Sequence, residues 1–86
     1  FYPHDLVVDK NGVIYVAFPQ ESRVLRFDSS GVPLSDLLTG FAAHHVRIHP
    51  VNGNLYVKDN GGTYKVVQPD GTVVKTFSLP DGTRSI

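Results

Sequence analysis

Gly12-Val13-Ile14-Tyr15-Val16-Ala17-Phe18 decides the fold, because the chain returns to the same pattern as Gly53-Asn54-Leu55-Tyr56-Val57-Lys58-Asp59. Each copy is a glycine that ends a turn, followed by a short β-rich apolar run centred on a Tyr-Val pair. The copies begin 41 positions apart, at Gly12 and Gly53, which is the length of one supersecondary unit repeated in tandem. The sequence therefore predicts two copies of one structural unit.

Length and composition indicate one small, soluble globular domain. The chain has 86 residues, of which 41% are hydrophobic, and its eight basic residues balance eight acidic ones. No apolar run approaches the roughly 20 residues that a membrane span needs, and neutral charge argues against nucleic-acid binding. The absence of cysteine excludes disulfides and thiolate metal sites; it is compatible with a secreted protein but does not fix the compartment.

The residues around the two runs read as partner strands in an all-β chain. Residues 13–18 are apolar at every position, which predicts an interior strand covered on both faces. Pro33, Ser35 and Asp36 mark 32–38 as an edge strand. Glycine and proline punctuate the chain at short intervals, and no helical period runs for three turns. We expect eight strands, over 6–8, 13–18, 23–27, 32–38, 46–48, 55–57, 63–67 and 72–77.

A repeat of about 40 residues divides the chain into two units. A one-residue insertion and a one-residue deletion cancel, so that His4 is equivalent to His44. A four-stranded antiparallel unit of this length is typical of a β-propeller blade. We therefore predict a first blade over 1–40, a second over 41–80, and the start of a third, incomplete repeat over 81–86.

The residues themselves resemble a known family. The stretch Pro3-His4-Asp5-Leu6-Val7-Val8-Asp9-Lys10-Asn11-Gly12-Val13-Ile14-Tyr15-Val16, followed by Arg23-Val24-Leu25-Arg26-Phe27-Asp28-Ser29-Ser30-Gly31, is similar to an NHL-type propeller repeat. The second unit matches less well, with Ala43, Thr63 and Gln68 in place of the proline, arginine and aspartate. The resemblance covers nearly the whole chain and implies an NHL-like β-propeller.

Rings of this family close with about six blades, which two blades cannot do. Two blades leave apolar faces exposed, a mark of an interaction surface. Either the chain is a piece of a longer propeller, or three copies associate to complete a six-bladed ring. The repeat phase of 81–86 favours the first reading. In both, we expect the partners to be further propeller blades, from the same longer chain or from a homo-oligomer.

His4 and His44 are the strongest candidates for chemistry. They stand one repeat apart, before the first strand of each unit, and that strand lines the channel of a propeller. Neutral imidazoles that converge near the axis could hold zinc or a similar metal. The alternative is structural, because a Pro-His pair also begins a strand with its imidazole hydrogen-bonded at a loop end.

A second resemblance bears on His4. Phe1-Tyr2-Pro3-His4-Asp5-Leu6 is similar to the segment of the peptidylglycine amidating lyases that carries a zinc-ligand histidine. This resemblance implies that His4 is a zinc ligand in an enzyme that cleaves hydroxyglycine-extended peptides. The family has glycine where Asp5 stands, and it has cysteines that this chain lacks.

The remaining polar residues have simpler interpretations. We expect His49 to accept a backbone hydrogen bond at its turn, as Asp9 does, and Tyr15 to be a core aromatic with a satisfied hydroxyl. Arg23 is expected to pair with Asp28 or Glu21 on the surface. His45, equivalent to Asp5, is not expected to form a metal pair with His44, because neighbouring strand residues point to opposite faces.

The sequence favours a non-catalytic binding or scaffold role, because propeller loops mostly provide ligand and protein contacts. A zinc-dependent lyase or hydrolase half-site of the amidating-lyase type is the alternative, and RNA binding by an NHL propeller comes third. Whether the chain is an enzyme stays open.

Overall fold

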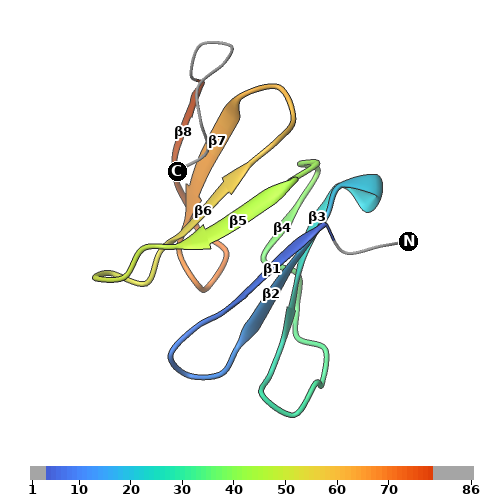
Figure 1. The fold of residues 1–86 in the computed structure, drawn as a ribbon, viewed down its shortest axis with the longest axis vertical. Coiled ribbons are helices and arrows are strands. Elements are labelled where there is room, and N and C mark those ends of the chain that lie inside the picture. Colours follow the sequence, from blue (N-terminus) through green and yellow to red (C-terminus); the bar gives the residue numbers. More distant parts are fainter. Residues whose placement is uncertain (1–3, 79–86) are drawn as a thin grey trace.

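The computed structural model describes residues 4–78 as eight strands and one 3-10 helix (Figure 1). These elements are β1 (Asp5–Val8), β2 (Ile14–Phe18), η1 (Pro19–Glu21), β3 (Arg23–Phe27), β4 (Leu38–Thr39), β5 (His45–Ile48), β6 (Leu55–Lys58), β7 (Thr63–Val67) and β8 (Val73–Ser78). They form two antiparallel sheets, ordered β1-β2-β3-β4 and β5-β6-β7-β8. The predicted all-β class with two four-stranded sheets is confirmed. The predicted start of a third repeat, 81–86, lies outside the described residues.

The strand alternation gives the first sheet two different faces. Its inner face, which packs against the second sheet, carries the cross-strand rows Asp5-Ala17-Val24 and Val7-Tyr15-Arg26. Its other face, called the open face below, carries Leu6-Val16-Leu25 and Val8-Ile14-Phe27. The open face is therefore apolar along both of these rows.

The second sheet is divided in the same way. Its inner face carries Val46-Val57-Lys65 and Ile48-Leu55-Val67. Its other face, called the far face below, carries Arg47-Tyr56-Val66 and His45-Lys58-Tyr64. The far face is thus more polar and basic than the open face.

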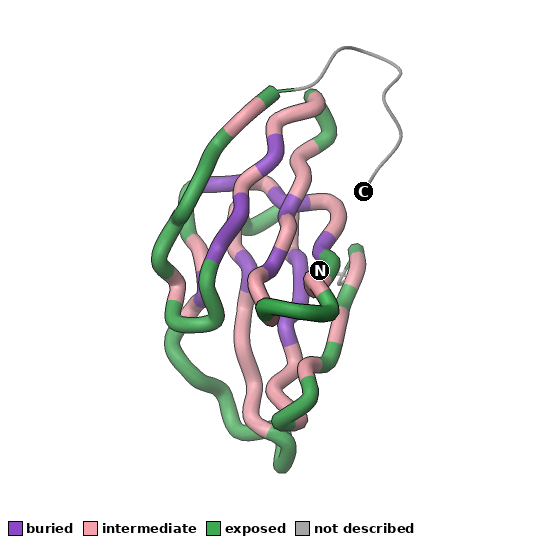
Figure 2. The backbone as a smooth tube through the Cα atoms, turned by 90° about the vertical axis from the view of Figure 1, so that its left-hand side faces the viewer, coloured by how far each residue is buried: buried purple, intermediate pink, exposed green. Residues whose placement is uncertain are grey.

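The hydrophobic core lies between the two inner faces. Figure 2 shows the buried residues concentrated in the middle of the molecule. Phe41 and Ala43, in the segment that links the sheets, close the core. Among the described residues it contains no buried charge. The cluster consists of Tyr15, Ala17, Val24, Leu37, Phe41, Ala43, Val46, Leu55, Val57 and Val67.

Aspartates fix the hairpin turns as the sequence predicts. The Asp9 carboxylate accepts hydrogen bonds from the backbone N–H groups of Asn11 and Val13, both at 2.9 Å. Gly12 follows with φ of +84°, a conformation that glycine adopts without the steric cost of a Cβ. The same carboxylate also accepts from the Tyr15 hydroxyl, so Asp9 holds both the turn and the following strand.

The prediction of a fourth strand over 32–38 is wrong. Pro33 forms only an isolated bridge with Phe27, and the strand β4 is confined to Leu38–Thr39. Proline has no N–H to give to a ladder. Ser35 is instead bound by the Arg26 side chain, through its carbonyl at 2.8 Å and its hydroxyl at 2.6 Å.

Over residues 4–78 there is no helix with the length and hydrophobicity of a membrane span.

Candidate functional site

Three polar links join the two sheets across the seam between them. Asp5 Oδ2 accepts hydrogen bonds from the Val46 N–H at 3.0 Å and from the Arg47 guanidinium at 2.7 Å. The Arg26 guanidinium donates to the Pro69 carbonyl at 2.8 Å. The third link joins His4 Nδ1 to the His44 carbonyl at 2.7 Å. The seam therefore combines an apolar core with a small number of directed polar contacts.

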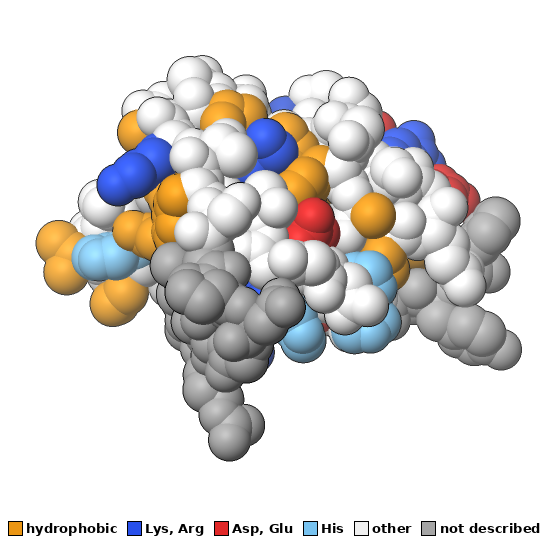
Figure 3. Space-filling view, turned by 90° about the horizontal axis from the view of Figure 1, so that it is seen from above, with side chains coloured by type: hydrophobic (Ala, Val, Ile, Leu, Met, Phe, Trp, Pro, Cys, Tyr) orange, Lys and Arg blue, Asp and Glu red, His pale blue; other side chains and the backbone are white. Residues whose placement is uncertain are grey.

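Three histidines gather at one end of this seam. The His4 ring lies 4.8 Å from the His44 ring and 5.6 Å from the His45 ring, centroid to centroid, both edge to face. Figure 3 shows histidine side chains gathered on the surface seen from above. We call His4, His44 and His45 the histidine cluster. The structure brings His4 and His44 together, as repeat equivalence predicts, and their role as metal ligands stays a prediction. It also brings His45 close to His4, which the sequence did not predict.

The hydrogen bonds of the cluster fix which ring nitrogens carry protons. His4 Nδ1 lies 2.7 Å from the His44 carbonyl, and His44 Nδ1 lies 3.1 Å from the Ala42 carbonyl. A carbonyl oxygen can only accept, so each Nδ1 is the donor. In the neutral rings, Nε2 then keeps its lone pair and is free for a proton or a metal ion.

His45 differs from the other two. Its Nδ1 lies 3.9 Å from Asp5 Oδ2, yet loss of hydration on burial lowers the pKa of His45, and nearby Lys58 adds to the effect. No group of three His, Asp or Glu side chains among residues 4–78 has the geometry of a metal site. Two imidazoles are too few for the tetrahedral sites that zinc prefers.

The simpler interpretations of His49 and Tyr15 are confirmed. His49 Nδ1 accepts from the backbone N–H groups of Val51 and Asn52. Tyr15 is 1% exposed and its hydroxyl donates to Asp9 at 3.0 Å. Burial, with this hydrogen bond, raises the pKa of Tyr15 to about 12.

The predicted ion pair of Arg23 with Glu21 is confirmed, and Asp36 is a second partner. The Arg23 guanidinium lies 2.6 Å from the Glu21 carboxylate and 3.2 Å from that of Asp36. Asp28 instead accepts from the N–H groups of Ser30 and Val32. The hydrogen bond to Glu21 raises the pKa of the Arg23 guanidinium. These contacts lie at the partly exposed edge of the first sheet and not at the seam.

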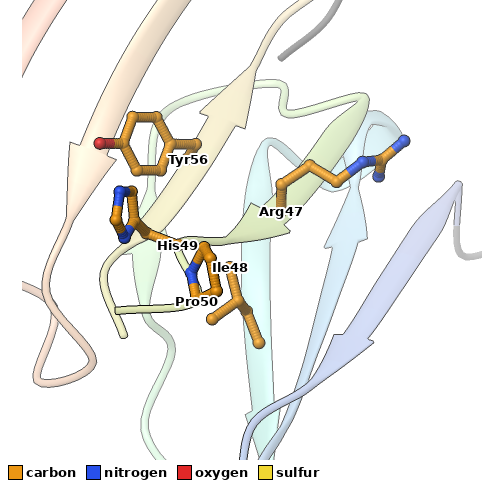
Figure 4. Close-up of a pocket in the computed structure, with 5 residues that line it drawn as sticks. All are labelled: Arg47, Ile48, His49, Pro50 and Tyr56. Atoms are coloured by element: carbon orange, nitrogen blue, oxygen red, sulfur yellow. The ribbon is translucent and has the colours of Figure 1, made fainter. Parts of the chain in front are cut away.

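A cleft of about 270 Å³ opens on the second sheet (Figure 4). Its walls come from β5, from the β5–β6 turn and from β6. The rings of His49 and Tyr56 stack at 6.0 Å with 28° between their planes, and in Figure 4 Arg47 points away from them. The lining residues are Arg47, Ile48, His49, Pro50 and Tyr56.

A second groove, of about 370 Å³, runs between the β1–β2 and β5–β6 turns. Asp9 and His49 stand on opposite sides of it, and both use their side chains as turn caps. These two polar side chains of the groove are thus engaged in their own turns.

The open face of the first sheet exposes apolar side chains whose positions the sequence analysis did not name. Leu6 and Val8 are 51% and 54% exposed, in rows whose other members are also apolar. One signal was available: residues 13–18 are apolar on both strand faces, which is typical of a strand covered on both sides. The structure covers only the inner side with a sheet.

Comparison with known proteins identifies the fold. No family model matches the chain, and no curated protein matches its sequence. Among solved structures, the chain is similar to the crystal structure of virginiamycin B lyase from Staphylococcus aureus, with a TM-score of 0.72 and 16% identity. The match covers 93% of this chain and 28% of the lyase, which is a seven-bladed β-propeller.

The covered share of the lyase is close to two sevenths, the size of two blades in seven. At 16% identity the likeness establishes the fold alone. The chain thus has the fold of two β-propeller blades and spans less than a third of that lyase's length.

Proposed function

We propose that this chain is a non-catalytic binding and scaffold unit, whose open face accepts a further propeller blade. One observation supports this above all. The open face is repeat-equivalent to the inner face of the second sheet, and that inner face is buried against a blade. Leu6 and Val8 are equivalent to Val46 and Ile48.

The equivalence can be followed row by row. Leu6-Val16-Leu25 corresponds to Val46-Val57-Lys65, and Val8-Ile14-Phe27 corresponds to Ile48-Leu55-Val67. Val46, Leu55, Val57 and Val67 are each 0% exposed beneath the first sheet. The open face has a similar apolar composition at the same positions, so burying it against another blade is favourable by the same mechanism.

A tandem chain tests this proposal without intermolecular association. Residue 1 of a second copy is made to follow residue 80 of the first, which keeps the 40-residue phase. The chain has no cysteine, so a single Val8→Cys change can be placed in either copy. We expect thiol labelling at least about tenfold slower for Cys in the second copy, which has a preceding blade, than in the first. Equal labelling rates would contradict the proposal.

A metal-dependent function is the second candidate, supported by the histidine cluster. His4 and His44 both donate from Nδ1 to backbone carbonyls, the outer-shell pattern that orients a metal-ligating Nε2. These two residues would supply part of a zinc site, with the remaining ligands coming from other blades. Zinc would act there as a Lewis acid or by activating water.

Zinc titration followed by calorimetry tests the second candidate. Saturable binding that His4→Ala and His44→Ala each abolish, and that His49→Ala leaves intact, would support it. His49 is the matched control because its Nδ1 is occupied by its own turn. Binding that survives both cluster variants would contradict the candidate.

A further inference from the structure

We propose that copies of this chain associate head to tail, with Val8 of one copy packing into the cleft beside His49 and Tyr56 of the next. The inference rests on the proposed blade-accepting role of the open face and names its partner, which is the far face of a second copy. It commits to one pairing of two different surfaces.

The packing within the chain supplies the template. β5 lies on β1 and β2, and Ile48 packs against the core cluster that contains Tyr15. By repeat equivalence, β1 of a following copy takes the place of β5, and β5 and β6 of the preceding copy take the places of β1 and β2. In a second copy related by this shift of one repeat, β1 would lie on β5 and β6 of the first copy.

The cleft lies at the place that this shift requires. Its walls come from β5, from the β5–β6 turn and from β6. Arg47 and Tyr56 are equivalent to Val7 and Tyr15, the residues beneath β5 inside the chain. Val8, equivalent to Ile48, is therefore the side chain that would enter the cleft. Its volume of about 270 Å³ is several times the roughly 30 Å³ that one water occupies, enough for an aliphatic side chain.

The contact would be weaker than the seam inside the chain. His45 stands where Asp5 stands in the first repeat, and Val66 stands where Arg26 does. The carboxylate link to Val46 and the guanidinium link to Pro69 therefore have no equivalents between copies. Apolar burial drives the association, so sulfate should strengthen it.

Because the two surfaces differ, the interface is heterologous. Each added copy leaves one open face and one cleft free, so the assembly either grows or closes into a ring. An even number of blades cannot reproduce a ring of seven. The pairing of the surfaces, and not the size of the assembly, is what we infer.

Two variants that each block one surface provide the test. Val8→Lys removes the inserting side chain, and Tyr56→Ala removes a wall of the cleft. A residue more than half exposed, such as Val8, tolerates substitution with little effect on folding. Pro50→Lys is a second cleft variant at an exposed position, should Tyr56→Ala disturb the sheet. Val74→Asp is the matched control, because Val74 is 53% exposed but lies on the edge strand β8.

The readout is sedimentation velocity of each protein over a range of concentrations, and native mass spectrometry of mixtures with one variant isotope-labelled. We expect wild type and Val74→Asp to self-associate, and each blocking variant to raise the dissociation constant by about tenfold or more. Mixing Val8→Lys with Tyr56→Ala should restore one interface and give a 1:1 dimer that grows no further.

Three results would overturn the inference. They are a wild-type chain that stays monomeric up to millimolar concentration, an assembly that survives either blocking variant, or a mixture that forms no heterodimer. Each is separable from the tandem experiment. A monomeric wild type whose tandem still protects position 8 would retain the blade-accepting role and overturn the inferred association of separate chains.

Discussion

Asp5→Ala should weaken the seam more than any single change at the exposed edge of a sheet. The Asp5 carboxylate is the acceptor for the Val46 N–H, and Val46 is 0% exposed. Losing the acceptor of a buried amide costs about 1–3 kcal/mol. The ion pair with the half-exposed Arg47 adds no more than about 1 kcal/mol. The Leu6 N–H, also bound by Asp5, belongs to an exposed residue and can turn to water.

We therefore expect Asp5→Ala to lower the free energy of unfolding by about 2–3 kcal/mol. A domain of this size has a total of roughly 4–13 kcal/mol, and the loss corresponds to a fall in Tm of about 10–20 °C. Asp5→Asn keeps an oxygen for the Val46 amide and should cost less than about 1 kcal/mol.

Urea unfolding followed by circular dichroism, at a concentration where the chain is monomeric, measures these differences. Asp36→Ala is the control, because Asp36 forms an ion pair with Arg23 away from the seam and its loss should cost under about 1 kcal/mol. If Asp5→Ala and Asp5→Asn were equally mild, the amide acceptor would not matter, and the reasoning about the seam would be refuted.

Three further predictions follow from single contacts. Gly71→Ala should destabilise the fold more than Gly31→Ala in thermal melts. Both glycines have positive φ, but an added Cβ at Gly71 would lie 3.0 Å from the Leu37 carbonyl oxygen, whereas at Gly31 it would meet no atom within 4 Å. Equal losses of stability in the two variants would contradict this. Burial raises the pKa of Tyr15 to about 12. The contribution of the neutral Tyr15 hydroxyl to stability should therefore be present below pH 10 and fall as pH rises toward 12. Tyr15→Phe should remove that fall in alkaline unfolding curves. Burial lowers the pKa of His45 below its usual 6.5, so its contribution should be present above pH 6.5 and be lost as pH falls below it; His45→Gln should flatten the acid limb, and an unchanged limb would contradict the assignment.

The repeat and most strands could be predicted from the sequence because both depend on local, periodic patterns of residues. Asp9 and Gly12 fix a turn from within four residues, and the apolar run that follows has the length of a strand. The predicted bounds of the fourth strand of the first sheet were wrong because they depend on a contact outside the local sequence. Whether residues after Pro33 join a ladder depends on Arg26, which takes the backbone and hydroxyl of Ser35 for its own hydrogen bonds, a contact that no local pattern predicts.

The sequence predicted only those contacts of the candidate site that join equivalent positions of the two repeats. The 40-residue phase was enough to bring His4 and His44 together, because equivalent positions on neighbouring blades converge. It could not predict that Asp5 and Arg47 meet across the seam. That contact joins two positions that are not equivalent, and it requires the angle between the sheets.

The two repeats differ at two positions that decide what can pack on the far face. In the first repeat, Asp5 and Arg26 bind the following blade through its backbone and side chains. In the second repeat, His45 and Val66 occupy those positions. His45 has no carboxylate to accept the hydrogen bonds that Asp5 accepts, and Val66 has no guanidinium to donate the one that Arg26 donates. The rows of the open face and the equivalent inner rows of the second sheet are meanwhile apolar except at Lys65. A blade added to the open face would therefore find a surface like the one already buried inside the chain, whereas a blade added to the far face would have to be held by shape and apolar contact at the cleft. This asymmetry makes Val8 and Tyr56 the decisive pair for self-association, and Asp5 the decisive residue for the fold of a single chain.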